Sequence, residues 1–198
     1  MFIKDWKKEL FTIPNFLSMF RLLLIPVYMT IYLNAKESKD YIIAGVILGL
    51  SCLTDMVDGK IARKFNMITT FGKFLDPLAD KITQFTLIFC LCIRHPILRA
   101  VLVLFFAKEL FQLIAGIMAA KRGYILKGAL MSGKVCTTVL FVSLVTLVIF
   151  PALSEIAVSM IALLDAFFLL IAFADYFRTY AGKSSQFQPL DDEPNANV

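Results

Sequence analysis

An all-α integral membrane protein is the fold class that this sequence predicts, and three observations support it. The 198-residue chain is 59% hydrophobic and 18% charged, whereas soluble domains carry about 25% charged residues. Several apolar stretches reach the roughly 20 residues that a helix needs to cross a bilayer. Lys and Arg are concentrated in alternate connectors. We therefore expect one domain of six transmembrane helices, preceded by an N-terminal amphipathic interfacial helix.

Residues 1–12 form the first expected element. Phe2, Ile3, Trp6 and Leu10 would share one helical face, and three lysines occupy the other faces. Such a helix lies on the membrane surface, where its lysines meet anionic lipid; a solvated cap is the alternative. The segment lacks the continuous apolar core of a cleavable signal peptide, so none is expected.

Six apolar segments follow, joined by short connectors that make neighbouring helices antiparallel. They form a transmembrane domain over residues 13–180, and the polar tail over 181–198 is expected to be disordered. The expected spans are 13–33, 41–60, 74–93, 97–119, 131–150 and 153–177.

The distribution of basic residues predicts the orientation. If six helices cross, thirteen Lys and Arg lie on the side of both termini and four lie on the opposite side. By the positive-inside rule both termini are cytoplasmic, facing the inside of the inner or plasma membrane if the protein is bacterial. The net charge of +5 then faces lipid headgroups, and no nucleic-acid-binding signature is present.

Four aspartates interrupt the apolar pattern of the second and third spans, in "SCLTDMVDGKIARKF" (51–65) and "FGKFLDPLADK" (71–81). Residues three or four apart share one face of a helix, so small and acidic residues form two stripes. In an antiparallel pair the stripes can face each other, which would bring four carboxylates into one small volume. The stripes are Asp55, Asp58, Gly59 and Ala62 on one helix, and Gly72, Asp76 and Asp80 on the next.

Four neighbouring carboxylates need positive charge, because each ionised aspartate within a span costs about 2.5–3.5 kcal/mol. Arg63, Lys64 and Lys73 offer three charges, and an acid–base network with helix-packing glycines is the alternative. Ligands that are all oxygen suit Mg²⁺, Mn²⁺ or Ca²⁺. Two such ions about 4 Å apart stabilise the attacking and leaving oxygens in phosphoryl chemistry. The four cysteines and His95 show no metal-ligand spacing.

The two stripes also resemble the signature of a protein family, the CDP-alcohol phosphatidyltransferases. The match holds at every defined position of Asp55-x2-Asp58-Gly59-x2-Ala62-Arg63-x8-Gly72-x3-Asp76-x3-Asp80. The resemblance implies six membrane helices, two Mg²⁺ or Mn²⁺ ions, a homodimer, and transfer of a phosphatidyl group from CDP-diacylglycerol to an alcohol with release of CMP. It implies metal ligation by Asp55, Asp58 and Asp76, and a general base at Asp80 that can also touch a metal. It places the CDP-lipid at Asp58, Gly59, Ala62, Arg63 and Gly72.

The stretch "TIPNFLSMFRLLLIPVY" (12–28) resembles the first span of phosphatidylglycerophosphate synthases and of cardiolipin synthases that use CDP-diacylglycerol. Lys108, Gly116 and Cys136 stand where members that use glycerol-3-phosphate often have Arg, Arg and Lys. These departures reduce the positive charge expected around the phosphate of glycerol-3-phosphate. Glycerol-3-phosphate is still the favoured acceptor; phosphatidylglycerol, inositol phosphate and serine are alternatives. The expected acceptor or phosphate ligands are Asn15, Ser18, Arg21, Lys108, Lys134 and Arg178.

Simpler explanations exist for several of the remaining charges. Lys108 and Glu109 could form an ion pair between helices, and Asp175 and Arg178, spaced i, i+3, an interfacial ion pair. Asp165 could make a buried hydrogen bond between helices or a dimer contact.

Two functions outside the family also use membrane carboxylates. A membrane prenyltransferase binds Mg²⁺-diphosphate through aspartate pairs, but the spacing of Gly59, Ala62-Arg63 and Gly72 argues against it. A cation-coupled transporter typically places its carboxylates near the bilayer midplane, whereas these lie at the expected cytoplasmic edge. Release of CMP would indicate the phosphatidyltransferase, and release of pyrophosphate the prenyltransferase. Ion flux without CMP release would indicate the transporter.

Overall fold

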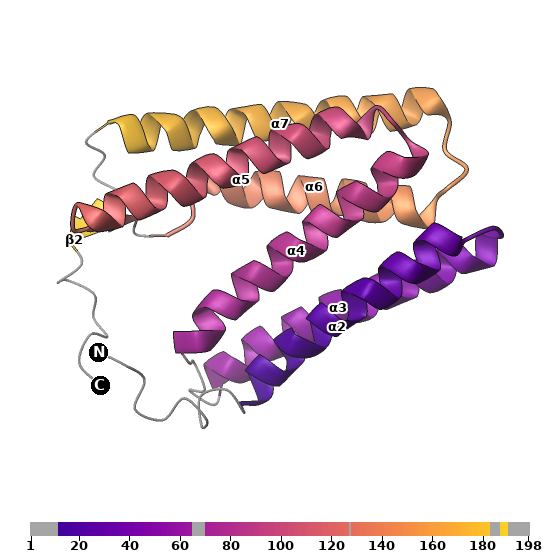
Figure 1. Cartoon of the computed structure of the whole chain (residues 1–198), viewed down its shortest axis with the longest axis horizontal. Coiled ribbons are helices and arrows are strands. Elements are labelled where there is room, and N and C mark those ends of the chain that lie inside the picture. Colours follow the sequence, from indigo (N-terminus) through magenta and orange to yellow (C-terminus); the bar gives the residue numbers. More distant parts are fainter. Residues whose placement is uncertain (1–11, 65–69, 127, 183–186, 190–198) are drawn as a thin grey trace. The chain divides into compact units, whose positions relative to one another are not determined.

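The computed structural model describes residues 12–64, 70–126, 128–182 and 187–189, without the side chains of 13–14, 55–64, 70–71 and 73–74. The described residues form helices α2 to α7 and one two-stranded sheet (Figure 1). The predicted interfacial helix over 1–12 lies outside them, apart from Thr12, which is the N-cap of α2. The helices are α2 Ile13–Asn34, α3 Ser38–Lys64, α4 Thr70–Arg94, α5 Leu98–Lys121, α6 Met131–Ile149 and α7 Glu155–Ala181.

Each predicted apolar segment overlaps one of these helices, so the prediction of an all-helical protein is confirmed. Among the described residues, four helices are long and apolar enough to cross a membrane: α2 from Asn15, and the whole of α5, α6 and α7. The connector expected over 60–73 is shorter than predicted, because α3 continues to Lys64 and α4 begins at Thr70. Lys and Arg are good helix formers, so the basic residues extend the helix past its apolar segment. All four aspartates of the stripes lie in helical turns, as the expected spans placed them.

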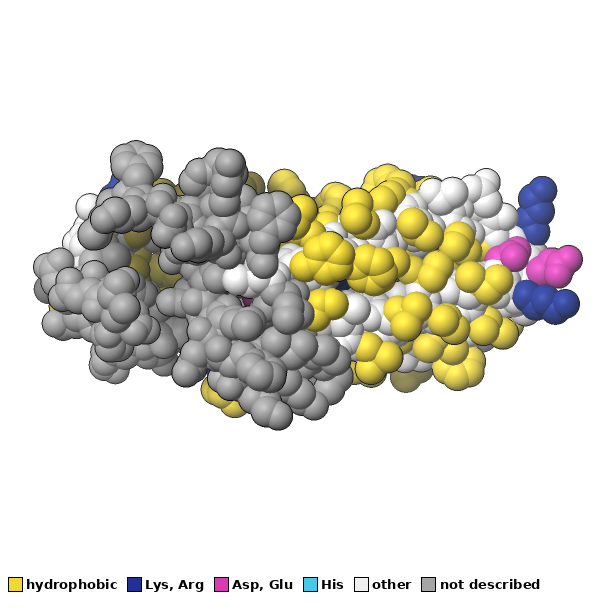
Figure 2. All heavy atoms as spheres, turned by 90° about the horizontal axis from the view of Figure 1, so that it is seen from below, with side chains coloured by type: hydrophobic (Ala, Val, Ile, Leu, Met, Phe, Trp, Pro, Cys, Tyr) yellow, Lys and Arg dark blue, Asp and Glu magenta, His cyan; other side chains and the backbone are white. Residues whose placement is uncertain are grey.

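Apolar side chains cover much of the outside of the helices. On α2 and α3 they include Phe16, Leu23, Val27, Val46 and Leu53, which are 46–67% exposed. On the face drawn in Figure 2, hydrophobic side chains form a broad band, and charged side chains lie at one end of it. Soluble monomers rarely expose contiguous apolar patches larger than a few hundred Å². This surface is that of an integral membrane protein.

Contacts divide the chain into two units, and the first contains residues 1–94 and 144–153. Within it, α2 packs against both α3 and α4. A cluster of aromatic rings and one arginine packs together at one end of this unit. That end is remote from the aspartates along α3. The Arg94 guanidinium lies 4.6 Å from the ring centroid of Tyr41 and donates a 3.3 Å hydrogen bond to the Pro151 carbonyl. The rings of Tyr41 and Tyr32 meet edge to face at 5.6 Å.

The second unit contains residues 95–143 and 154–198, with α5 packed against α7. It also holds strands β1, Tyr124–Leu126, and β2, Phe187–Pro189, which pair antiparallel. The predicted disorder of the tail is therefore wrong at β2, because Phe187 packs on Tyr180 with ring centroids 5.5 Å apart. The tail residues 183–186 and 190–198 lie outside the described residues.

Gly133 on α6 allows Tyr176 of α7 to pack closely. A Cβ atom at this position would lie 2.7 Å from the Tyr176 hydroxyl oxygen and 2.9 Å from its Cε2. Tyr176 is buried, and its hydroxyl accepts a 3.3 Å hydrogen bond from the backbone N–H of Leu130. We expect Gly133→Ala to destabilise the protein by about 1–3 kcal/mol through overpacking, measured as a lower thermal-unfolding temperature in detergent. Gly49→Ala is the control, since its added Cβ would have no packing neighbour within 4 Å beyond the adjoining backbone of its own helix; an equal loss in both variants would contradict the expectation.

Candidate functional site

The N-terminal half of α2 carries a buried polar stripe. Asn15, Ser18 and Arg21 follow one another at i, i+3 and i+6, and they are 1%, 0% and 2% exposed. A helix that crosses a membrane cannot present such groups to lipid without a large free-energy cost. The stripe is therefore buried against protein, and α4 supplies partners for Ser18 and Arg21.

Two aspartates of α4 accept hydrogen bonds from this stripe. The Ser18 hydroxyl donates to Oδ1 of Asp76, and Nη1 of Arg21 donates to Oδ1 of Asp80 at 2.6 Å. Asp76 and Asp80 are one helical turn apart on α4. The Asp80 side chain is still 48% exposed. One helix thus holds two carboxylates in place, and one of these carboxylates is open to the surroundings.

Arg21 and Asp80 form a charge-assisted pair, which is stronger and more directional than a neutral hydrogen bond. The Arg21 side chain is buried, whereas the Asp80 side chain is half exposed. The pair orients Asp80 and offsets part of the negative charge of the cluster. The contacts show Ser18 and Arg21 bound to aspartates; the phosphate-binding role expected for them and for Asn15 stays a prediction.

The other stripe lies in the last turns of α3. The backbone there is helical, but the side chains of Asp55, Asp58, Gly59, Ala62 and Arg63 are outside the described set. Ser51 lies one turn before Asp55 and is 5% exposed, so this helix face is buried up to the start of the stripe. On α4 the small residue Gly72 is buried as well. The convergence of the two stripes stays a prediction.

The donor set at this site fits a hard divalent cation. Asp76 and Asp80 each use Oδ1 for the contact with α2, and a carboxylate has about four acceptor sites on its two oxygens. Ligands that are all oxygen suit Mg²⁺ or Mn²⁺. No group of three His, Cys, Asp or Glu gathers among the side chains that the structure describes. The contribution of Asp55 and Asp58 from α3 to the ligand set stays a prediction, because their side chains lie outside the described residues.

Gln84 extends the α4 stripe by one further turn and is not among the site residues predicted from the sequence. The residue is 4% exposed, and its Oε1 makes no hydrogen bond within the described part of the chain. Buried polar groups normally have a partner, so Gln84 is a candidate site residue. Its spacing of i+4 from Asp80 is the signal that could have identified it.

Three of the four cations expected near the acceptor belong to the second unit: Lys108, Lys134 and Arg178. The fourth is Arg21 on α2. Nζ of Lys108 lies 2.7 Å from Oε1 of Glu109, and the Lys108 side chain is 4% exposed. Lys108 also lies 5.5 Å from the ring centroid of Tyr176. The Lys108–Glu109 ion pair therefore forms within α5, whereas the alternative explanation placed it between helices. Lys134 and Arg178 are both exposed.

Two other acidic residues of this unit have neighbours on α6. The Ser132 hydroxyl donates to Oδ2 of Asp175, and the predicted ion pair between Asp175 and Arg178 is wrong for the described side chains. Asp165 is 0% exposed and has Ser143 as its polar neighbour, although neither of its carboxyl oxygens meets hydrogen-bond geometry with a described residue. This burial favours the contact between helices over the dimer contact.

Comparison with known proteins gives a family match and several relatives. The sequence model of the CDP-alcohol phosphatidyltransferase family matches residues 11–174. The CDP-diacylglycerol–glycerol-3-phosphate 3-phosphatidyltransferase of Rickettsia bellii is 42% identical over 71 residues, which is 35% of this chain and 38% of that protein. The enzyme of the same name from Bacillus subtilis is 45% identical over 84 residues, or 37% and 44% of the two chains.

A third relative matches over a longer range. The probable phosphatidylglycerophosphate synthase of Mycobacterium tuberculosis is 30% identical over 160 residues, which is 80% of this chain and 75% of that protein. The match to the Rickettsia and Bacillus relatives spans less than half of their length.

Proposed function

Because this chain belongs to the CDP-alcohol phosphatidyltransferase family, we propose that it transfers a phosphatidyl group from CDP-diacylglycerol to glycerol-3-phosphate. The products are phosphatidylglycerophosphate and CMP. The observation that carries the proposal is the contact of the buried α2 stripe with Asp76 and Asp80. It holds two signature carboxylates together at the end of membrane helices. The names of the Rickettsia and Bacillus relatives support glycerol-3-phosphate as the acceptor.

In this proposal all six helices cross the membrane, and the termini and the aspartates face the cytoplasm. Helices α3 and α4 have 27 and 25 residues, and at about 1.5 Å per residue each exceeds the hydrocarbon core of about 30 Å. The acidic and basic residues at one end of each of these two helices lower the mean hydropathy of that helix. The excess of Lys and Arg on that side supports the orientation. A homodimer follows from the family resemblance.

We assign the metal ligands to Asp55, Asp58 and Asp76. Bound Mg²⁺ or Mn²⁺ ions would neutralise the pyrophosphate of the CDP-lipid and the charge that develops on the departing CMP. Gly59, Ala62 and Gly72 leave room for the nucleotide beside the helices. Arg63 has the planar guanidinium that grips a phosphate through two parallel hydrogen bonds.

We assign the general base to Asp80. As the acceptor oxygen forms its bond to the lipid-side phosphorus, the carboxylate takes the hydroxyl proton, and the bond from phosphorus to the CMP oxygen breaks. The half-exposed Asp80 side chain is accessible to an acceptor. Its 2.6 Å bond from Arg21 holds one oxygen and so limits the directions in which the carboxylate can rotate. Arg21 is therefore a positioning residue for this base.

Phosphatidylglycerol is a second candidate acceptor, and it would give cardiolipin. Free glycerol-3-phosphate is a dianion, yet Lys108 is already paired with Glu109, and Gly116 and Cys136 carry no charge. Exposed Lys134 and Arg178 remain as the cations of this unit expected to bind a phosphate. A phosphodiester needs less positive charge than a phosphate dianion.

An acceptor panel tests the function. Purified protein is incubated with CDP-diacylglycerol, Mg²⁺ and one alcohol at a time, and CMP and lipid products are quantified. We expect CMP and phosphatidylglycerophosphate with glycerol-3-phosphate; cardiolipin with phosphatidylglycerol would support the second candidate. No CMP from any acceptor would reject both. Pyrophosphate release from a prenyl diphosphate would indicate a prenyltransferase, and ion flux into proteoliposomes without CMP a transporter.

Replacement of Arg21 tests its positioning role. We expect Arg21→Gln to lower kcat about 10–100-fold, since a hydrogen bond to a charged group contributes about 1.5–3 kcal/mol. The KM for CDP-diacylglycerol should change by less than about threefold. Arg21→Lys keeps the charge without the planar fork and should recover part of kcat. Arg99→Gln, at an exposed position, is the control; a kcat of Arg21→Gln equal to that of the control would refute the role.

A further inference from the structure

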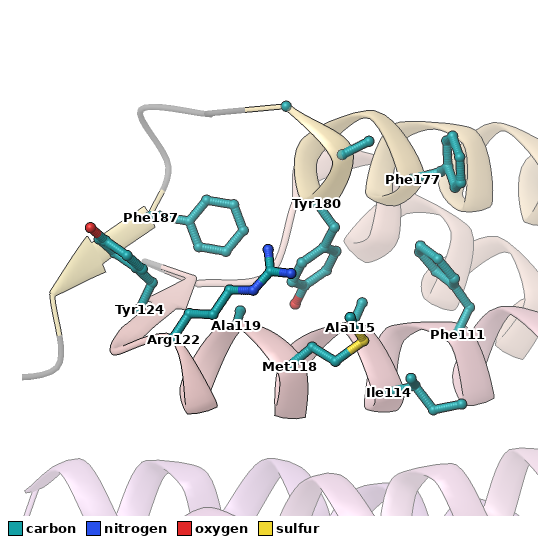
Figure 3. A pocket seen from close by; sticks show the side chains of 12 residues that line it. Phe111, Ile114, Ala115, Met118, Ala119, Arg122, Tyr124, Phe177, Tyr180 and Phe187 are labelled. Carbon is teal, nitrogen blue, oxygen red and sulfur yellow. The ribbon is translucent and has the colours of Figure 1, made fainter.

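A large pocket in the second unit shares no residue with the aspartate site. Its volume is about 780 Å³, which lies within the range of small-molecule sites. Helix α5 supplies one wall, the end of α7 a second, and the strand pair a third, through Tyr124 and Phe187 (Figure 3). The walls are mostly apolar and aromatic, with polar groups supplied by Arg122, Tyr124 and Tyr180.

The α5 wall is a continuous stripe that ends at a cation. Its residues run from Phe111 to Arg122 at spacings of three and four, so they share one helix face. At a rise of about 1.5 Å per residue, this stripe is about 16 Å long, close to half of the roughly 30 Å hydrocarbon core. Small side chains at Ala115 and Ala119 keep the groove open. The groove thus has the length and the direction of one acyl chain in one leaflet.

Arg122 is the charged residue of the lining, and Figure 3 shows its guanidinium reaching over the pocket toward Tyr180 and Phe187. None of the described side chains forms an ion pair with it, and none of the lining residues is acidic. Tyr124 and Tyr180 combine apolar rings with polar tips, as side chains at a membrane–water interface commonly do. The groove therefore ends, beside these tyrosines, at a cationic side chain that can bind a phosphate.

We propose that this pocket binds an anionic phospholipid, with one acyl chain along α5 and its phosphate on Arg122. Arginine binds a phosphate through two parallel hydrogen bonds, and Arg122 is the charged residue of the lining. A zwitterionic headgroup would bring an ammonium group that finds no carboxylate in the lining. Anionic lipid is the occupant that both the apolar groove and its single cation fit.

Native mass spectrometry of the full-length protein tests the site. The protein is purified in detergent with EDTA and offered phosphatidylglycerol or phosphatidylcholine with the same acyl chains. We expect about tenfold greater retention of phosphatidylglycerol by the wild type, and about tenfold less of it by Arg122→Gln. Lys121→Gln makes the same charge change outside the lining and should stay within about twofold of the wild type. Equal losses in the two variants, or equal retention of the two lipids, would overturn the proposal.

A second pair of variants tests the groove itself. Ala119→Trp fills it and should remove the retained lipid, whereas Ala120→Trp, at an exposed neighbour outside the lining, should not. Unchanged binding in Ala119→Trp would reject the acyl-chain channel. Binding that appears only after deletion of residues 190–198 would assign the pocket to the chain's own tail. Since none of these measurements uses CMP release, the lipid site and the proposed reaction can fail separately.

Discussion

Asp80→Asn is expected to abolish phosphatidyl transfer while leaving CDP-lipid binding nearly intact. The asparagine amide has almost the same shape and can still lie against Arg21, but it cannot accept the acceptor's proton. General-base catalysis typically contributes about 10²–10⁴-fold to a rate, so kcat should fall by about three orders of magnitude. The measurement is CMP release in single-turnover conditions, paired with binding of CDP-diacylglycerol by fluorescence or calorimetry.

Asp40→Asn is the matched control for this variant. Asp40 lies in the first turn of α3, where its Oδ2 accepts hydrogen bonds from the backbone N–H groups of Lys36 and Glu37 at 2.8 and 3.0 Å. These bonds lower the pKa of the Asp40 carboxyl, but this residue is far along α3 from the aspartate stripe. Its substitution should leave kcat within about twofold of the wild type. Retained turnover in Asp80→Asn would remove Asp80 as the base.

Removal of divalent cations is expected to have an equally large effect. Protein dialysed against EDTA should lose phosphatidyl transfer by at least about 10³-fold, because the carboxylates alone cannot neutralise a pyrophosphate. Addition of Mg²⁺ or Mn²⁺ should restore the activity, and Zn²⁺ should restore it poorly, since no His or Cys is expected among the ligands. The rate of CMP release against free metal concentration is the measurement.

The thermal-unfolding temperature separates loss of metal from loss of fold. The contacts of Ser18 and Arg21 with α4 involve protein groups alone, so the metal-free protein should remain folded. Full activity in EDTA, with metal content shown to be below one ion per ten chains, would contradict the proposed role of divalent cations.

Apolar run length was sufficient to predict the helices, and local spacing was sufficient to place the aspartates on two helix faces. The contacts of Ser18 with Asp76 and of Arg21 with Asp80 join positions 58 and 59 residues apart. No helical periodicity specifies such a pair. The sequence indicated Asn15, Ser18 and Arg21 as acceptor or phosphate ligands. The packing of α2 on α4 identified Asp76 and Asp80 as hydrogen-bond partners of Ser18 and Arg21.

The errors have equally local causes. Spacing along α7 permits Asp175 to reach Arg178, but Ser132 on another helix is its hydrogen-bond partner. The strands β1 and β2 have three residues each, too few for an alternating pattern to be recognised. The end of α3 was placed too early because the prediction followed hydropathy, whereas Lys and Arg continue a helix readily.

The number of Mn²⁺ ions bound per chain tests the central claim most directly: that divalent cations complete the carboxylate cluster. Electron paramagnetic resonance of the purified protein, titrated with Mn²⁺ in the presence of CDP-diacylglycerol, reports both the count and any coupling between neighbouring ions. We predict two bound ions per chain in the wild type, and loss of binding in the double variant Asp55→Asn, Asp76→Asn. Mn²⁺ binding that is absent from the wild type, or that persists unchanged in the double variant, would contradict the account.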